Sequence, residues 1–500
     1  KLTNTTMLTA DKAFGLKNRH RINATAGVEI EDLDYKYREV TVSSFLSNDK
    51  NYLSNGSVMK EWKGGGYGYS QFSVISNVNY NYRSRYYAAA SFRNDQSSRF
   101  LKGNRGGSFW SVSGSWRITN EDFMKPYRDV INSLKLKASV GTNGNLPSEY
   151  YSMQTFKPVN YVDLPGAVFE SRVSEDLTWE KNRIWNFGFE SGFFNNRIKF
   201  SAEYYDRKTK NLLLDMVVSN TSGQRTVLVN SPTAGIKNTG WEFELSGTIY
   251  ENKDWYVGLN FNIATLKSRI FGLEAGFPDS KNRQYSRNGY SPHSWWLKPY
   301  AGINEETGQL QYWGYKDDGT PEILNSSTNS PTQMTGKQGI PKYTGGLSLS
   351  ASYKNFDISA LFSFAGGHHI FNRQASMYTE NDGYQLGGVA RNQLDRWTPL
   401  NTTSKNPLRM NDGSYSSTNT RFLYKGDYLK LRNVTFGYTL PERITKAVRL
   451  KNAKVFIQGE NLWLLSEIKD YDPELSMDGY RNYDTYPFAI TFTAGLNINF

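Results

Sequence analysis

The chain has 500 residues, of which 38% are hydrophobic and 15% aromatic, and 59 basic against 47 acidic side chains give it a net charge of +12. It has no cysteine, which excludes disulfides, thiolate metal sites and a cysteine nucleophile. No apolar run approaches the roughly 18 residues of a transmembrane helix. The basic residues are spread along the chain without the stripe or tail that is typical of nucleic-acid binding, so no nucleic-acid partner is expected.

Alternation of apolar and polar residues predicts β-hairpins along most of the chain, because successive side chains of a strand point to opposite faces. The final segment, 488–500, alternates without a break. In chain order the predicted hairpins are 74–82 with 86–92, 185–193 with 198–204, 241–249 with 255–263, and 343–353 with 356–364.

One predicted strand changes phase. The apolar residues Leu429 and Leu431 stand at odd-numbered positions, whereas the apolar residues Val434 and Phe436 stand at even-numbered positions. This change predicts a β-bulge near Arg432-Asn433.

The apolar face of these strands is rich in Phe, Tyr and Trp, and the strands are about 10 residues long, which is enough to cross a bilayer when tilted. A soluble sandwich or propeller would place Val, Leu and Ile on its buried face instead. The sequence therefore predicts an all-β fold, a transmembrane antiparallel β-barrel formed by one domain over 1–500.

Short and long connections alternate along the chain. Since outer-membrane barrels have short periplasmic turns and long extracellular loops, the short set and the C-terminus are predicted to be periplasmic. About 15 strands are expected, an odd set that cannot close in lipid without further strands, so we expect N-terminal strands of a 22-stranded barrel to be missing. The predicted long loops are 31–71, 94–108, 141–183, 207–239, 264–342, 366–427 and 461–487.

Several ordered segments resemble the SusC-like TonB-dependent outer-membrane transporters of Bacteroidetes. One departure is Asp95-Gln96, where the family usually has Asp-Gly. The segments are SFRNDQSSRF (91–100), LKLKASVGTNGN (134–145), IPKYTGGLSLSASYKNFDIS (340–359), RWTP (396–399), YLKLRNVTFGYTLPERI (428–444), AKVFIQGENLW (453–463) and YDPE (471–474).

This resemblance implies a non-enzymatic importer of an oligomeric glycan or peptide in the outer membrane. It also implies a SusD-like lipoprotein partner, coupling to the TonB complex through a plug that this sequence lacks, and contact with outer-membrane lipid and lipopolysaccharide. The terminal Phe500 resembles the signal for outer-membrane insertion. The alternative is a SusC-like barrel that serves as a structural subunit of a larger complex.

Aromatic residues in the loop 264–342 are the candidate substrate-binding or partner-binding residues, since loops have no part in the aromatic girdles of the membrane. They would stack on a sugar or pack on a partner protein; the alternative is a small core of the loop itself. The candidates are Trp295, Trp296, Tyr300, Tyr312, Trp313 and Tyr315.

Other motifs give weaker expectations. The glycine-rich segment 64–68 lacks the lysine of a phosphate loop and predicts a flexible extracellular loop. The adjacent His368 and His369 predict ordinary loop residues, so no metal site is expected. Calcium is the one cofactor suggested, at Asp317-Asp318-Gly319, although a full ligand series is absent. Mixed charges on the polar faces, including Lys454, Gln458 and Glu460, suit a wet lumen.

Overall fold

The computed structural model describes residues 1–500 except 48, 50–51, 148–154, 163, 172–173, 220, 222–225, 280, 282, 381–389, 410–417, 448, 470, 476–477, 482–487 and 500. Within these described residues, strands dominate and sixteen of them form one sheet. Fifteen follow one another in the order β1-β2-β3-β4-β5-β6-β9-β10-β13-β14-β23-β24-β27-β28-β30, and β15 pairs beside them with β13. The predicted all-β class and strand number are confirmed. None of the described helices has the length and apolar character needed to span a membrane.

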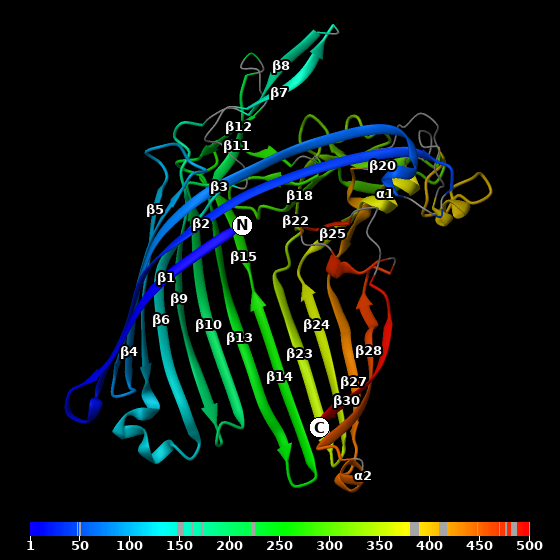
Figure 1. The fold of residues 1–500 in the computed structure, drawn as a ribbon. Coiled ribbons are helices and arrows are strands. Elements are labelled where there is room, and N and C mark those ends of the chain that lie inside the picture. Colours follow the sequence, from blue (N-terminus) through cyan, green and yellow to red (C-terminus); the bar gives the residue numbers. More distant parts are fainter. Residues whose placement is uncertain are drawn as a thin grey trace. The chain divides into compact units, whose positions relative to one another are not determined.

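The chain divides into two compact units, and the first comprises Lys1–Asp122, Leu136–Phe187 and Arg207–Gly235. Its strands follow one another as antiparallel neighbours, visible as the blue-to-cyan ribbons of Figure 1. They are β1 (Leu2–Phe14), β2 (His20–Phe45), β3 (Gly56–Tyr82), β4 (Tyr86–Ser97), β5 (Gly106–Arg117) and most of β6 (Ile131–Asn145), with the loop hairpins β7 (Thr155–Tyr161)–β8 (Leu164–Ser171) and β11 (Leu213–Val217)–β12 (Thr226–Asn230).

The predicted loop 31–71 is wrong. β2 and β3 stay paired from His20↔Tyr82 as far as Phe45↔Gly56, so only 46–55 connects them. The glycine-rich segment 64–68 is therefore strand rather than flexible loop. Cross-strand aromatics explain this, because Tyr37 lies opposite Gly65, and a Cβ built there would meet the tyrosine ring at 2.9 Å. An aromatic ring over a glycine compensates for the packing that the glycine lacks.

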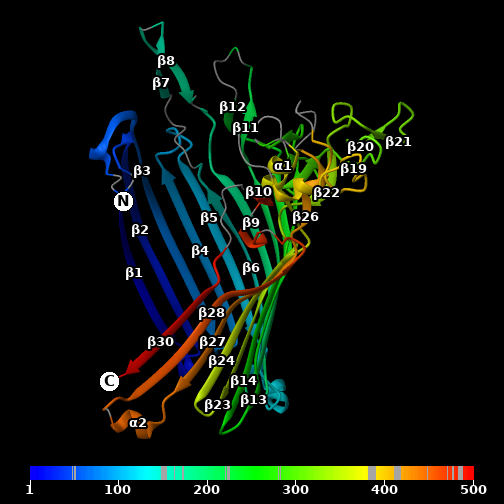
Figure 2. The same ribbon diagram turned by 90° about the vertical axis from the view of Figure 1, so that its right-hand side faces the viewer.

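The second unit comprises Phe123–Lys135, Gly188–Asp206 and Ile236–Phe500. Figure 2 shows its last strands side by side, from yellow-green β23 to red β30. Its long strands are parts of β9 (Glu180–Phe193) and β10 (Ile198–Lys210), most of β13 (Gly235–Glu251), then β14 (Trp255–Thr265), β23 (Tyr343–Tyr353), β24 (Phe356–Gly366), β27 (Tyr428–Thr439), β28 (Asn452–Ser466) and β30 (Thr491–Asn499).

The predicted hairpins of this unit are confirmed. β23 and β24 pair from Tyr343↔Gly366 to Tyr353↔Phe356. The bulge also lies where the phase changes, since the β27–β28 register shifts between Leu431 and Asn433. The last strand begins at Thr491 rather than 488, and Phe500 lies outside the described residues.

The long loops of the second unit are folded rather than open. Within the described residues they contain one short α-helix and further short strands, most of which pair in small sheets. These are β15 (Lys267–Phe271), β16 (Phe277–Pro278), β17 (Tyr285–Ser286), β18 (Ser294–Leu297), β19 (Tyr300–Ile303), β20 (Leu310–Tyr315), β21 (Pro321–Leu324), β22 (Gln333–Gln338), β25 (His369–Asn372), α1 (Arg373–Glu380), β26 (Leu423–Lys425) and β29 (Tyr480–Arg481), while α2 (Glu442–Ala447) lies in a short connection.

Substitutions at two adjacent residues of β23 test which face of the strand contacts lipid. Leu349 is exposed at 38% on the face that carries the exposed rings of Tyr343 and Tyr353, and Ser348 lies on the other face. We expect Leu349→Arg to cost about 2–4 kcal/mol in a bilayer, because it places a charge against hydrocarbon. Ser348→Arg, at the same depth, should cost much less. Urea unfolding of both variants in vesicles measures the difference, and equal costs would contradict the assignment.

Candidate functional site

The folded loops of the second unit share an apolar core. We call the described parts of 266–342, 367–427 and 467–490 the loop module. Its central cluster takes residues from all three loops, with exposures from 0% to 7%. Three separate connections therefore fold as one body. The cluster is Trp295, Leu297, Phe371, Phe422, Leu423 and Tyr480.

A small mixed sheet joins two of these loops. β25 pairs antiparallel with β26 and parallel with β29, where Phe371 lies opposite Tyr480. A parallel pair requires a long crossover, and here about a hundred residues separate the partners. The register of this pairing cannot be read from local sequence.

Trp295 is the centre of this core and is fully buried. Its ring lies edge-on to Tyr480 with 5.0 Å between centroids, and its Nε1 donates to the carbonyl of His369 at 2.9 Å. The Tyr480 hydroxyl donates to Asp279 Oδ2 at 2.6 Å. Burial, followed by this hydrogen bond, raises the pKa of Tyr480, so the hydroxyl stays a donor at neutral pH.

The other loop motifs also serve packing. Trp397 of the RWTP segment is 6% exposed, and its Nε1 donates to the carbonyl of Glu305 at 2.9 Å. The ring lies against Gly308, where φ is +72° and a Cβ would meet it at 2.4 Å. Only glycine fits this turn.

One face of the β19-β20-β21 sheet is exposed and apolar. Leu310 and Tyr312 of β20 are buried, while Trp313 and Tyr315, which follow them on the opposite face, are exposed at 42% and 51%. Trp313 pairs with Ile323 and Tyr315 with Pro321, and directly opposed residues share a face. We call Trp313, Tyr315, Pro321 and Ile323 the aromatic platform.

The six predicted loop aromatics thus fall into three environments. Trp295 belongs to the central cluster, and Tyr312 is buried outside it. Trp296 and Tyr300 are half-buried, the former with its ring 4.9 Å from that of Tyr285. Trp313 and Tyr315 lie on the platform. Contact with a substrate or a partner stays a prediction for all six.

A buried ion network was missed by sequence reasoning. Lys430 of β27 has a side chain only 2% exposed, and its Nζ pairs with Asp472 and lies 3.5 Å from Glu474. Arg432 pairs with the same glutamate. The network fixes the loop after β28 to the polar face of β27. The YDPE segment and the alternating basic residues of β27 were the available signals, but the sequence did not show that they meet.

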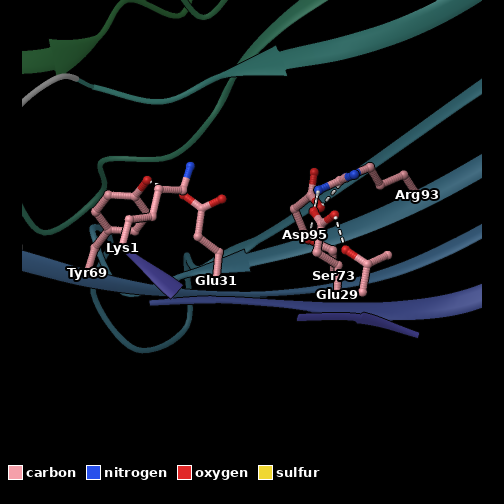
Figure 3. A network of polar contacts seen from close by, with 8 residues as sticks. Lys1, Glu29, Glu31, Tyr69, Ser73, Arg93 and Asp95 are labelled. Atoms are coloured by element: carbon pink, nitrogen blue, oxygen red, sulfur yellow. Dashed lines mark hydrogen bonds and ion pairs between the residues drawn. The ribbon is translucent and has the colours of Figure 1, made fainter. Parts of the chain in front are cut away.

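The first unit carries a second network on its polar face, shown in Figure 3. Arg93 of β4 contacts Glu29 of β2 at 2.8 Å, Ser73 of β3 at 3.0 Å and Asp95 of its own strand at 2.6 Å. Nearby, Glu31 accepts a hydrogen bond from the Tyr69 hydroxyl and forms an ion pair with Lys1. Paired charges that cross three strands indicate a hydrated face with a fixed arrangement rather than a reactive centre.

The remaining polar candidates are engaged in structure. Lys454 crosses Gly437 to reach Asp357 at 2.7 Å, and Gln458 donates to Glu460 at 2.7 Å. Asp318 Oδ1 accepts from the backbone nitrogen of Thr320 at 2.8 Å, which closes the β20–β21 turn. In the described part of the chain, no group of three or more His, Asp or Glu residues is arranged to hold a metal ion.

Long antiparallel strands with one apolar and one polar face, carrying a folded loop module, define a membrane β-barrel protein. The chain belongs to the TonB dependent receptor-like, beta-barrel family, whose sequence pattern matches residues 2–462.

Named relatives support this assignment. The chain is 28% identical to TonB-dependent receptor P3 of Formosa agariphila over 99% of this chain and 52% of the relative. It is 27% identical to TonB-dependent receptor SusC of Bacteroides thetaiotaomicron over 86% of this chain and 43% of the relative. A solved structure of the RagAB peptide transporter matches with a TM-score of 0.86 and 28% identity, covering 99% of this chain and 55% of that one. The chain spans about half the length of the relatives it matches.

Alanine substitutions of one core and one surface tryptophan should differ in their effect on the stability of the loop module. Trp295→Ala should destabilise the loop module by about 3–5 kcal/mol, because it empties the centre of the core. Trp313→Ala on the platform should change stability by less than about 0.5 kcal/mol. Hydrogen exchange of β25 and β26 amides measures both. A small effect at Trp295 would show that the core does not hold the loops together.

The loop module should weaken in mild acid. Burial lowers the pKa of His293, His368 and His369, the last to about 4. The pKa of histidine in an unfolded chain is about 6.5. Between about pH 6.5 and 4 the unfolded module therefore binds more protons than the folded one, and the stability of the module falls as the pH drops through that window. Urea midpoints at pH 7.5 and 4.5 should differ, and His369→Gln should reduce the difference. An unchanged midpoint would argue against buried neutral histidines.

Proposed function

We propose that this chain is the barrel portion of an outer-membrane active importer that takes up an oligomeric nutrient, a glycan or a peptide. The similarity to SusC and to the RagAB peptide transporter over nearly the whole chain supports this class. The observation that carries the proposal is the loop module: three connections fold around Trp295 and present an aromatic platform outward. Long ordered loops are usually functional.

The proposed orientation places the short turns and the C-terminus in the periplasm and the loop module outside the cell. The short connections between β9 and β10, β13 and β14, and β23 and β24 lie at one set of strand ends. The folded loops follow the other set, as in outer-membrane barrels generally.

The platform suits two uses within one transport cycle. An exposed Trp and Tyr beside Ile and Pro offer flat apolar area that loses little conformational entropy on binding. Such a surface stacks on sugar rings or packs against an apolar patch of a protein. We propose that it contacts the SusD-like lipoprotein or the cargo that this lipoprotein delivers.

The polar networks suit the lumen of such an importer. Arg93 and Lys430 keep their charges paired while facing the hydrated side of the sheet. We propose that a plug domain occupies the lumen and is moved through TonB, which couples uptake to the proton gradient of the inner membrane. The alternative, a SusC-like barrel acting as a structural subunit, predicts stable co-purifying partners and no uptake.

Paired substitution of the platform tests this function. Trp313→Ala with Tyr315→Ala in the full-length protein should leave folding unchanged and lower uptake or lipoprotein co-purification at least about tenfold, since each aromatic contact contributes about 1 kcal/mol or more. Lys316→Ala with Asp317→Ala in the same hairpin is the matched control. Uptake is measured with labelled oligosaccharides and oligopeptides.

Unchanged uptake and co-purification in the platform variant would place the contacts elsewhere in the loops. A protein that shows no uptake of either class, yet stays in a stable complex with other outer-membrane proteins, would favour the structural alternative.

A further inference from the structure

A pocket of ≈ 410 Å³ lies at the base of the loop module, where the chain leaves β14 and enters β15. It is lined only by residues of the second unit, and no acidic residue lines it. Its lining residues are Leu266, Lys267, Ser268, Arg269, Gly289, Tyr290, Ser291, Ser294, Gly336, Gln338 and Lys342.

Three cationic residues line this pocket. Lys267 and Arg269 are exposed and alternate with the buried Ser268 and Ile270, so both project from the same side of β15. Lys342 approaches from the start of β23, where Leu266 donates its backbone hydrogen to the Lys342 carbonyl at 2.8 Å. Among the described residues, none of these three side chains forms a hydrogen bond or an ion pair.

Some other cations of the same unit do have acidic partners. Lys237, Lys430 and Lys454 each pair with a carboxylate. Like charges gathered without acids repel one another, and a bound anion relieves that repulsion. The arrangement therefore favours an anionic ligand.

A buried hydroxyl in the pocket supports the same conclusion. Ser291 is 4% exposed, and its Oγ has no hydrogen-bond partner within the described chain. Its position is fixed on both sides, since Ile270 donates to the Tyr290 carbonyl at 2.8 Å and Ser294 Oγ donates to the Ser291 carbonyl at 2.9 Å. A buried hydroxyl without a partner costs free energy, which an oxyanion accepting its proton would offset.

We propose that this pocket binds a phosphate-type oxyanion, with Lys267, Arg269 and Lys342 supplying charge and Ser291 a hydrogen bond. Arginine forks and lysine ammonium groups form the strongest hydrogen bonds to such oxygens. The volume far exceeds the roughly 30 Å³ of a water molecule, which leaves room for a sugar or ester attached to the phosphate.

The position along the strands suggests two sources of the phosphate. Lys267 lies two residues beyond the end of β14 at Thr265, which pairs with Tyr343 at the start of β23. Aromatic rings and basic residues at the ends of membrane strands lie at the level of lipid headgroups. The group is therefore carried either by a lipopolysaccharide or by a free phosphate compound.

The test uses the full-length protein purified from outer membranes. In the variant Lys267→Gln, Arg269→Gln, Lys342→Gln, the affinity for inorganic phosphate measured by calorimetry after delipidation should fall at least about tenfold, because charge-assisted hydrogen bonds are lost. The control Lys253→Gln, Arg443→Gln, Lys451→Gln removes the same charge at the short connections and should bind as the parent does. Phosphate binding that is absent, or equally weak in both variants, overturns the proposal.

Co-purifying lipid distinguishes the two sources. Mass spectrometry of the detergent-extracted protein should show phosphorylated lipopolysaccharide that the pocket variant loses and the control keeps. If phosphate affinity depends on the pocket but lipopolysaccharide retention does not, the ligand is a free phosphate compound. Neither measurement requires transport, so failure of the proposed function leaves this test intact.

The single variant Ser291→Ala gives a second test, which can be made even if the triple variant does not fold. Without phosphate its melting temperature should equal or exceed that of the parent, since a buried hydroxyl without a partner is removed. The upward shift of the melting temperature caused by phosphate should shrink. A phosphate-induced shift equal to that of the parent would contradict a role for Ser291.

Discussion

Backbone hydrogen bonding in lipid is the constraint on which the rest of this structure depends. Hydrocarbon offers no partner to an N–H or C=O group, so every backbone group that lies in lipid needs a hydrogen-bond partner within the protein. The antiparallel ladders satisfy this requirement, as β2 and β3 do over their whole length. Strand alternation then assigns every second residue to lipid and leaves the others for water. The exposed rings of β23 and the ion pairs of Arg93 follow from that single division.

The loops are stabilised differently from the strands, because they fold in water. Three separate connections share the apolar cluster around Trp295. Sharing makes the module cooperative: Tyr480 from the last loop, Phe371 from the second and Trp295 from the first each need the other two. On β20, the burial of Leu310 and Tyr312 leaves Trp313 and Tyr315 facing outward.

Charges are treated differently on the two kinds of surface. On the polar faces of the strands, cations such as Arg93, Lys430 and Lys454 are paired with carboxylates, which keeps a fixed and nearly neutral wall. At the boundary between strands and loops, Lys267, Arg269 and Lys342 gather without acids. Buried or half-buried pairs contribute structure, whereas an unpaired cluster creates a local positive potential that attracts anions.

The sequence by itself determined the strands, because the alternation of apolar and polar residues involves only neighbouring residues and requires no distant partner. The hairpin at Lys354-Asn355 and the bulge near Arg432-Asn433 were both readable for that reason. It did not determine how far β2 and β3 extend, since pairing of the glycine-rich segment depends on tyrosines across the strand. Nor could it separate the buried Trp295 from the exposed Trp313. Both lie in one aromatic-rich loop, and only contacts with distant residues such as Phe371 and Tyr480 decide which ring is covered.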